Sequence, residues 1–401
     1  MTTQVLMTPG PVPLPSEVLD VLAKPMEHHR TPEFMALFNR VLENLRKVFS
    51  TSEPAFIHTS TGSGGMESAI VNTLSPGDPV LCIVSGKFGE RWAEMAAVFG
   101  ARVTRLHVEW GRVVDVREIE KHLDAHPETV AVLTQACETS TGALQPIREI
   151  GQVVRKTKAL LMVDAITALG ALPMPMDEWG IDVMIGGSQK AFMLPTGLSF
   201  ISFSKKAWAL TETSKMPKFY FDIRREKEAN ARGESYFSTA VTHIRALDFV
   251  LELFLKVGMH KVHERIQALS KATIVAAREM GLKILSDVPS PSVTAIVMPD
   301  GIDSQKVRSH MEKISNVIVM GGQDHLKTKI VRIGHMGAIS DDDLITMLRA
   351  LAQGIRSEEM ARVGPANTEP TAISSSIISN EALERALEEA RRLLAETPAV
   401  L

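Results

Sequence analysis

The chain has 401 residues, 45 % of them apolar, and a formal net charge of −3, so it is long enough to bury a sizeable core and to form two domains. The near-neutral charge and the lack of a basic block argue against nucleic-acid or membrane-surface binding, and without a run of about 18 uncharged apolar residues we expect no membrane span. No basic flank precedes an apolar segment at the N-terminus, and both cysteines stand in apolar stretches without a second ligand nearby. We therefore expect a cytoplasmic protein with buried thiols and no metal site.

The first two thirds of the chain predict a mostly parallel sheet covered by helices. The segment 8–13 is rich in proline and glycine, which indicates an extended arm or a turn, and a helix is expected over 33–49. From there to about residue 250, short apolar runs alternate with helix-like stretches. The predicted strands, taken as apolar throughout, are 79–85, 101–108, 129–134, 159–166, 181–187 and 198–203, and the helices between them are 65–74, 89–99, 115–124 and 146–156.

The last third predicts a second, smaller α+β set. A long helical pattern from about 240 to 281 leads to strands at 292–298, 317–322 and 328–334. After 357, a stretch rich in Gly, Pro and Ser predicts a linker, and a last helix is expected over about 380–396, capped by Ser379 or Asn380. The predicted domains are an N-terminal arm (1–19), a large domain (20–255), a small C-terminal domain (256–357) and a linker with an extra helix (358–401).

The run STGSGG at 60–65 has the composition of a phosphate cup. It lies between an apolar segment and a predicted helix. Small residues let the backbone approach a ligand, and a helix start offers free N–H groups and the positive end of a dipole. The run matches neither the dinucleotide fingerprint nor a Walker motif, so a plain glycine-rich turn stays open as the alternative.

Three charged residues stand alone beside apolar strands. Asp164 ends the strand 159–166, where a carboxylate is poorly solvated and needs a cation such as a protonated pyridine nitrogen. Lys190 follows the strand 181–187 in an otherwise uncharged stretch, where desolvation lowers the pKa of an amine and favours Schiff-base chemistry. Arg332, on the strand 328–334, is a natural fork for a carboxylate. The alternatives are a helix cap or ion pair for Asp164, a surface lysine for Lys190, and a surface ion pair for Arg332.

The order of these features, a phosphate cup followed by Asp, Lys and then Arg, predicts a pyridoxal-phosphate enzyme that acts on amino acids. The chain also resembles the class V aminotransferases of the fold-type I pyridoxal-phosphate superfamily, specifically the alanine–glyoxylate, serine–pyruvate and serine–glyoxylate group. The resemblance runs from about residue 8 to 355 and rests on TPGP, STGSGGMESAIVN, GKFGERW, ETSTGALQP, LLMVDAITALGA, GIDVMIGGSQKAFMLPTG, SYFSTAV, MGG and VRIGHMG.

The resemblance implies an α/β fold with a mostly parallel central sheet, a smaller α+β C-terminal domain, pyridoxal 5'-phosphate as cofactor and a homodimer with shared active sites. Lys190 resembles the lysine that binds the cofactor as a Schiff base, Asp164 the partner of the pyridine nitrogen, and Arg332 the clamp for the substrate carboxylate. The other implied cofactor contacts are Thr61, Gly62 and Ser63 in the phosphate cup, Gln189 beside the phosphate, Phe88 and Ile166 on the two ring faces, Thr139 at the ring hydroxyl, and Tyr236 and Thr239 reaching from the neighbouring subunit. Ser63 stands where a relative carries His, and Phe88 where relatives often have Trp.

The implied reaction transfers an amino group from alanine or serine to glyoxylate or pyruvate, with Lys190 as general base. One arginine clamp favours small substrates, although Arg30 is a candidate for a second. His28, His29 and Arg30 either edge the substrate entrance or form a loop at a dimer contact.

Other class V transaminases (aminoethylphosphonate, ureidoglycine or phosphoserine) remain alternatives. A cysteine desulfurase is disfavoured because no cysteine follows Cys137 and because Gln189 replaces the usual His. A nicotinamide oxidoreductase is disfavoured because no dinucleotide fingerprint follows the first strand. A non-catalytic protein that kept the fold is disfavoured by the intact Lys190, Asp164 and Arg332.

Overall fold

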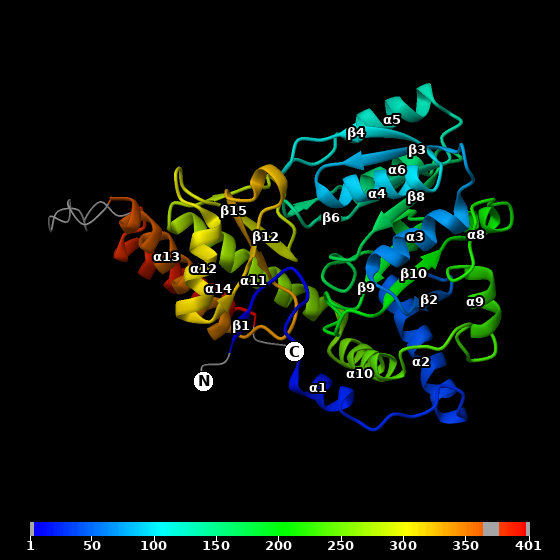
Figure 1. The fold of residues 1–401 in the computed structure, drawn as a ribbon, viewed down its shortest axis with the longest axis horizontal. Coiled ribbons are helices and arrows are strands. Elements are labelled where there is room, and N and C mark those ends of the chain that lie inside the picture. The colour runs from blue at the N-terminus through cyan, green and yellow to red at the C-terminus, as the bar shows by residue number, and fades with distance from the viewer. Residues whose placement is uncertain (1–3, 364–376, 398–401) are drawn as a thin grey trace.

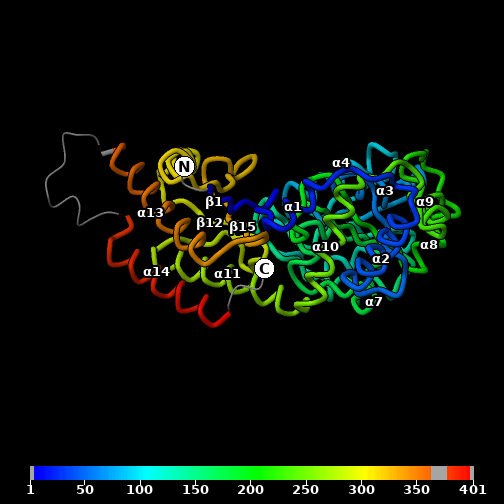
Figure 2. Tube along the Cα trace, turned by 90° about the horizontal axis from the view of Figure 1, so that it is seen from below, coloured from blue at the N-terminus to red at the C-terminus, as the bar shows by residue number. Residues whose placement is uncertain are grey.

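The structure is a computed structural model that describes residues 4–363 and 377–397. A larger and a smaller body lie side by side, and the N-terminal segment passes between them (Figure 1). In the view turned by 90°, helices α13 (Asp341–Val363) and α14 (Asn380–Ala395) form the outer end of the smaller body (Figure 2). Within the described ranges, no helix is long and apolar enough to cross a membrane.

The larger body is built on a seven-stranded sheet. Strand β10 is antiparallel to both of its neighbours and the other paired neighbours are parallel, so the prediction of a mostly parallel sheet is confirmed. In the register, Asp164 lies opposite Gln135 on one side and Ile185 on the other, so three central strands end at one edge. In spatial order the strands are β2 (Ala55–His58), β10 (Ser199–Phe203), β9 (Val183–Gly187), β8 (Leu160–Asp164), β5 (Ala131–Gln135), β3 (Pro79–Val84) and β4 (Arg102–His107).

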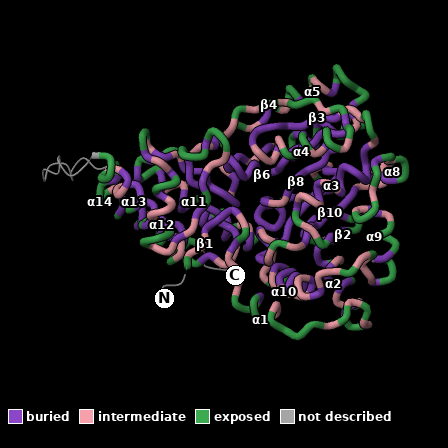
Figure 3. Tube along the Cα trace, viewed as in Figure 1, coloured by how far each residue is buried: buried purple, intermediate pink, exposed green. Residues whose placement is uncertain are grey.

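Helices cover both faces of this sheet. Successive residues of β8 point to opposite sides, as the period of a strand requires: Leu161 and Val163 join one hydrophobic cluster, and Leu160 and Met162 join the other. Figure 3 shows the buried strands between half-exposed helices. The helices of the larger body are α1 (Ser16–Leu22), α2 (Pro32–Phe49), α3 (Gly62–Thr73), α4 (Lys87–Val98), α5 (Val116–Ala125), α6 (Ile147–Val154), α7 (Met176–Trp179), α8 (Lys205–Thr211), α9 (Ile223–Asn230) and α10 (Val241–Val257).

Two sequence expectations for the larger body were wrong in detail. The strand expected at 101–108 is not a buried central strand, because β4 is the outer strand of the sheet and its side chains are exposed or half-exposed. Its polar residues, among them Arg102 and Arg105, suit an edge that faces water. The single helical pattern from 240 to 281 is broken at Gly258, where φ is +93° and α10 gives way to α11 (Met259–Glu279).

The smaller body packs α11, α12 (Ser304–Ser315), α13 and α14 around an antiparallel sheet. That sheet has the order β11 (Lys283–Ile284), β12 (Val293–Val297), β15 (Ile330–Gly334) and β14 (Met320–Gly321). Near the N-terminus, β1 (Val5–Leu6) pairs with β13 (Val317–Ile318), which fastens the arm to this body. Three short elements complete the described fold: β6 (Cys137–Glu138), β7 (Ala143–Leu144) and the 3-10 turn η1 (Asp324–Leu326). The domain boundaries at residues 19, 255 and 357 stay predictions.

The C-terminal helix α14 is part of the smaller body's core. The Ser379 side chain caps it by accepting the Ala382 N–H at 3.0 Å, and Leu387 and Leu394 are fully or nearly fully buried. Helix α13 continues past residue 357, where the composition predicts a linker, because Ser357–Val363 contains good helix formers. The linker expected at 364–376 lies outside the described residues.

Candidate active site

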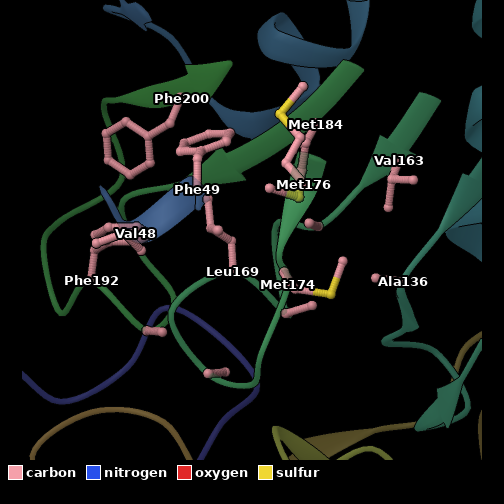
Figure 4. Packing of buried hydrophobic residues seen from close by; sticks show 14 of the residues in the cluster. Val48, Phe49, Ala136, Val163, Leu169, Met174, Met176, Met184, Phe192 and Phe200 are labelled. Carbon is pink, nitrogen blue, oxygen red and sulfur yellow. The ribbon is translucent and has the colours of Figure 1, made fainter. Parts of the chain in front are cut away.

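Lys190 lies in a tight loop between β9 and β10, at the edge where the central strands end. Ser188 closes this loop, since its hydroxyl donates to the Pro195 carbonyl at 2.7 Å. Phe192, two residues after the lysine, is fully buried and lies beside Phe200 with 4.6 Å between ring centroids (Figure 4). The backbone is therefore anchored close to Lys190 on both sides.

The Lys190 amine is buried rather than extended into water, which rules out the surface-lysine alternative. The residue is 9 % exposed, and its Nζ donates to the Pro9 carbonyl at 2.7 Å. Burial lowers the pKa of Lys190 to about 8, an effect that Asp164 opposes and Arg332 reinforces. A fraction of the amine is thus unprotonated near neutral pH, and the unprotonated form is the nucleophile.

The arm segment that holds Pro9 passes directly over the lysine. Gly10 has a φ of +136°, and a Cβ at this position would overlap the Lys190 side chain. On the other side, Gly334 of β15 approaches so closely that a Cβ there would overlap the Thr8 carbonyl. Both glycines therefore permit close contact, and the arm lies between the lysine loop and the strand that carries Arg332.

Asp164, the last residue of β8, is 6 % exposed and accepts the Ile166 N–H at 2.9 Å. Burial raises the pKa of Asp164 to about 6; the charge of Glu138 adds to this, while Lys190 and Arg91 oppose it. The raised pKa shows that the surrounding positive charge only partly offsets the burial of the carboxylate. A cation bound beside Asp164 would stabilise its ionised form and lower its pKa.

Arg332 is buried and joins the two bodies, so it is not a surface ion pair. It is 6 % exposed, and it donates from Nε to the Gly321 carbonyl at 2.8 Å and from Nη1 to the Thr139 carbonyl at 2.9 Å. Burial lowers the pKa of Arg332 to about 10, so the group stays charged at neutral pH. Two of the five guanidinium donors of Arg332 are thus used by backbone carbonyls.

The hydroxyl of Thr139 lies 2.8 Å from the hydroxyl of Thr167.

The predicted phosphate cup is the first turn of α3. The helix begins at Gly62, earlier than the expected residue 65, with Thr61 as the N-cap residue; within the described chain the Thr61 side chain caps none of its N–H groups. A Cβ on Gly62 would overlap the Ile166 side chain, so the glycine lets that side chain pack directly against the helix start. First-turn N–H groups lack partners within the helix and carry the positive end of its dipole, which suits an anion.

Phe88, Ser63 and Gln189 lie around the same region. The guanidinium carbon of Arg91 is 5.0 Å from the Phe88 ring centroid, and its Nη1 donates to the Ser63 hydroxyl at 3.3 Å. The Gln189 Oε1 atom is buried and has no hydrogen-bond partner among the described residues. Arg91 was not singled out from the sequence, although its position three residues after Phe88 on a helix is a signal for such a contact.

Tyr236 and Thr239 lie between α9 and α10. The Tyr236 hydroxyl accepts from Arg225 Nη1 at 2.7 Å, and Thr239 lines a small cavity with Thr59 and Tyr220. The structure therefore places Thr239 beside the segment that leads into the phosphate cup of its own chain. That the pair reaches the phosphate of a neighbouring subunit stays a prediction.

His28, His29 and Arg30 lie in the loop between α1 and α2. The two imidazole rings stack with centroids 4.6 Å apart, and the Arg30 N–H donates to His28 Nδ1 at 3.2 Å. Burial and the neighbouring cations lower the pKa of His29, whereas Glu234 opposes the shift. Because the charge of Glu234 acts on the pKa of His29, this loop lies near the segment that carries Tyr236. Whether the loop edges the substrate entrance or forms a dimer contact stays a prediction.

The donor set fits pyridoxal 5'-phosphate. The cofactor's three functional parts, a phosphate, an aldehyde and a basic pyridine nitrogen, each have a counterpart here. A glycine-lined helix start faces a position for an anion, the buried Lys190 amine suits an aldehyde, and Asp164 lacks a full cationic partner. The unpartnered oxygen of Gln189 adds a buried polar atom without a role in the described fold.

Glu138, directly before Thr139, was missed by sequence reasoning. It is fully buried, and its oxygens accept N–H groups at the start of α4, the helix that carries Phe88. The available signal was a lone acid three residues after the buried strand β5, similar to the pattern that drew attention to Asp164.

Comparison with known proteins identifies the family of the chain. The family profile described as Aminotransferase class-V matches residues 9–343. The soluble hydrogenase 42 kDa subunit of Anabaena cylindrica is 38 % identical over 351 residues, which cover 86 % of this chain and 91 % of the relative. The L-aspartate–glyoxylate aminotransferase of Paracoccus denitrificans is 36 % identical over 350 residues, which cover 85 % of this chain and 88 % of that protein.

The crystal structure of ureidoglycine–glyoxylate aminotransferase from Bacillus subtilis matches with a TM-score of 0.88 and 29 % identity, over 98 % of this chain and 99 % of that one. A match over 98 % of the chain includes most of the C-terminal extension. The predicted fold-type I architecture and the resemblance drawn from the motifs are both confirmed. The chain belongs to the class-V aminotransferase family.

Proposed function

We propose that the protein is a pyridoxal 5'-phosphate-dependent aminotransferase that moves the amino group of alanine or serine to glyoxylate or pyruvate. The observation that carries this proposal is the buried Lys190 amine, whose pKa responds to Asp164 on one side and to Arg332 on the other. The Paracoccus and Bacillus relatives both carry glyoxylate in their names, which supports glyoxylate as the acceptor.

The family resemblance implies which residue would hold each part of the cofactor. The first turn of α3, at Gly62 and Ser63, would hold the phosphate, with Gln189 beside it. Asp164 would hold the protonated pyridine nitrogen, and Thr139 the ring hydroxyl. Phe88 and Ile166 would pack against the two ring faces. When bound, the cofactor supplies an aldehyde that forms imines with amines and a ring that withdraws electrons from the substrate α-carbon.

Lys190 performs the proton transfers. Its amine would take the proton from the α-carbon of the amino acid and would later deliver it to the cofactor carbon bonded to the substrate nitrogen, so one base would serve both steps. A pKa of about 8 suits this role, because the group both accepts and releases a proton near neutral pH. The Pro9 carbonyl, 2.7 Å from Nζ, gives the amine a fixed resting position.

Arg332 orients the substrate. Its guanidinium remains charged although buried, and its contacts with the Gly321 and Thr139 carbonyls fix its plane. A carboxylate held by this fork would have its α-carbon aimed in one direction only. A single buried clamp supports a small monocarboxylic donor, and Arg30 is the sequence candidate for a second clamp if the donor is aspartate.

A cysteine desulfurase activity is not supported. Burial raises the pKa of the Cys82 thiol to about 12 and that of the Cys137 thiol to about 11, so neither forms the reactive thiolate near neutral pH. Both thiols are free and buried, which supports the proposal of a reducing, cytoplasmic location.

The test starts from purified protein, which should be yellow, and borohydride reduction should fix the cofactor onto Lys190, as read by peptide mass spectrometry. Lys190→Ala should lose transamination and still bind cofactor, while the exposed Lys205→Ala keeps the wild-type rate. A fully active Lys190→Ala enzyme overturns the mechanism.

The substrate assignment needs a separate measurement. Alanine, serine, aspartate, ureidoglycine, phosphoserine and aminoethylphosphonate are assayed as donors against glyoxylate and pyruvate. We expect alanine or serine to give the highest kcat/KM. A higher value for another donor refutes the substrate and leaves the reaction class intact.

We also propose a homodimer in which Tyr236 and Thr239 complete the neighbouring site. Lys190→Ala is expected to be inactive, and a Tyr236→Ala, Thr239→Ala double variant is expected to be weakly active. Mixed dimers of the two should recover about a quarter to a half of wild-type activity, because one of their two sites would be intact. No recovery in mixed dimers, shown to form by native mass spectrometry, contradicts sharing.

A further inference from the structure

One buried carboxylate, that of Glu138, connects the start of α4 with the turn at 138–140, and the proposed function does not use it. Glu138 lies in β6 and is fully buried. Its Oε2 accepts the N–H groups of Phe88 at 3.2 Å and Gly89 at 3.1 Å, and its Oε1 accepts the N–H of Ser140 at 3.1 Å. All of these partners are donors, so these hydrogen bonds favour the ionised carboxylate and oppose burial, which raises the pKa of Glu138.

The hydroxyl of Ser140 extends this contact. It donates to Glu138 Oε1 at 2.5 Å and accepts the Lys87 N–H at 3.1 Å. The first three N–H groups of the twelve-residue helix α4 are therefore all taken by the turn at 138–140. First-turn N–H groups have no partner within a helix, and a negative charge there is favoured by the dipole.

Two glycines make room for this arrangement. A Cβ on Gly86 would overlap both Glu138 and Ser140, and a Cβ on Gly89 would overlap the carbonyl of Ile83. In the motif GKFG, Gly86 thus permits the approach of Glu138 to the helix start, and Gly89 permits the close packing of α4 on β3. Phe88 has little freedom to shift along the helix axis while these bonds are made.

The charge of Glu138 also acts on the rest of the site. It raises the pKa of Asp164, a like charge, and raises that of Arg332, an opposite charge. Thr139, next to Glu138, accepts the Arg332 Nη1 donor at its carbonyl. One side chain therefore fixes the position of Phe88 and contributes to the electrostatics of both Asp164 and Arg332.

We propose that Glu138 is a positioning residue that holds Phe88 against the cofactor ring and sets the charge balance around Asp164. This inference rests on the proposed function. It assigns no direct contact with cofactor or substrate to Glu138.

The test is Glu138→Gln, which preserves the shape of the side chain. The amide nitrogen cannot accept, so donors of either α4 or Ser140 lose their acceptor, and the buried charge disappears. We expect the cofactor dissociation constant to rise about tenfold, in line with the loss of a hydrogen bond to a charged group. The pH midpoint of the visible absorption band of the bound cofactor should move to lower pH, because a lost negative charge disfavours nearby cationic forms. Glu149→Gln, at an exposed acid in the first turn of α6, is the matched control and should change neither quantity.

A second variant separates the two roles and covers a Glu138→Gln protein that fails to fold. Ser140→Ala removes the bridge to the Lys87 N–H and leaves the carboxyl group of Glu138 in place, so it should weaken cofactor binding and move the pH midpoint less than Glu138→Gln does. Unchanged cofactor affinity in either folded variant overturns the positioning role, and an unchanged midpoint in Glu138→Gln overturns the electrostatic one. A wild-type protein that takes up no cofactor refutes the proposed function together with this inference, whereas a wild-type protein that binds it beside unaffected variants refutes this inference alone.

Discussion

Replacing Asp164 by Asn is expected to stabilise the cofactor-free protein at pH 8 while it weakens cofactor binding. The substitution is nearly isosteric, and the Asn side-chain oxygen still accepts the Ile166 N–H that Asp164 accepts at 2.9 Å. The change that remains is the loss of one buried negative charge. A charge whose burial raises its pKa destabilises the folded state whenever it is ionised.

The size of the expected stabilisation follows from the shift in the pKa of Asp164. Burial raises the pKa of Asp164 from 3.8 to about 6, and each pKa unit corresponds to about 1.4 kcal/mol, which gives about 3 kcal/mol as an upper value. Lys190 offsets part of this gain, because Asp164 raises the pKa of that buried amine and its removal leaves the ammonium less stabilised. We expect a net increase in the free energy of unfolding of about 1 to 2 kcal/mol.

The stability advantage of Asp164→Asn should depend on pH in a defined direction. The folded-state pKa of Asp164 lies above the unfolded value, so its favourable contribution is complete below about pH 3.8 and is lost as the pH rises through about 6. The advantage of Asp164→Asn should therefore be full at pH 8 and largely absent at pH 4. Urea unfolding of cofactor-free protein at both pH values measures it, with the exposed Asp124→Asn as the control. An equal advantage at both pH values, or none at pH 8, refutes the assignment of Asp164 as a carboxylate without a full cationic partner.

Three other substitutions test separate parts of the structure. Arg332→Lys should raise the KM for every amino acid donor about tenfold or more, since an ammonium cannot replace the planar fork, and an unchanged KM in steady-state assays would remove Arg332 from the clamp role. Gly10→Ala should lower kcat much more than Gly77→Ala does. Both glycines have a positive φ, but only at Gly10 would the new Cβ meet the Lys190 side chain. Equal kcat values in the two variants would show that only the backbone strain matters. Leu387→Ala, at a fully buried position of α14, should lower the free energy of unfolding by about 2–5 kcal/mol in urea titrations; a change below about 0.5 kcal/mol would show that the C-terminal helix does not belong to the core.

The strands of the larger body were predictable because burial on both faces leaves a continuous apolar run. The runs at 79–85, 159–166 and 181–187 each contain a strand of the central sheet. The run at 101–108 was wrongly predicted to be a buried central strand. An edge strand and a central strand share the same backbone geometry and differ only in the number of neighbouring strands. No local pattern shows that β4 has a neighbour on one side only.

Helix boundaries failed for a related reason. The glycines at 62, 64 and 65 have poor helix propensity, which suggested a loop before residue 65, yet they form the first turn of α3 because Ile166 and other side chains pack directly against their backbone. Tertiary contact overrode propensity there. Gly258 was the opposite case, because a single glycine within a long amphipathic pattern gave little sign that its φ would be positive and would end α10.

The site was predictable where a charge stood alone in apolar surroundings. Asp164 and Lys190 were found on that signal, and the structure buries both. The contacts that define their chemistry were not predictable, because they join segments far apart in the chain: Pro9 and Lys190 are separated by 181 positions. Glu138 had the same signal as Asp164, but its role depends on the start of a helix 50 positions away.

Burial disfavours the charged form of all four charged groups of the site, and this is the physical basis of the proposed cofactor binding. The pKa values of Asp164 and Glu138 are raised, and those of Lys190 and Arg332 are lowered, so in each case burial disfavours the charged form. A bound ring with a protonated nitrogen would compensate Asp164, and covalent attachment would replace a buried ammonium. The same desolvation that destabilises the cofactor-free site therefore makes the amine nucleophilic and favours uptake of the cofactor, and any substitution that relieves it should exchange activity for stability.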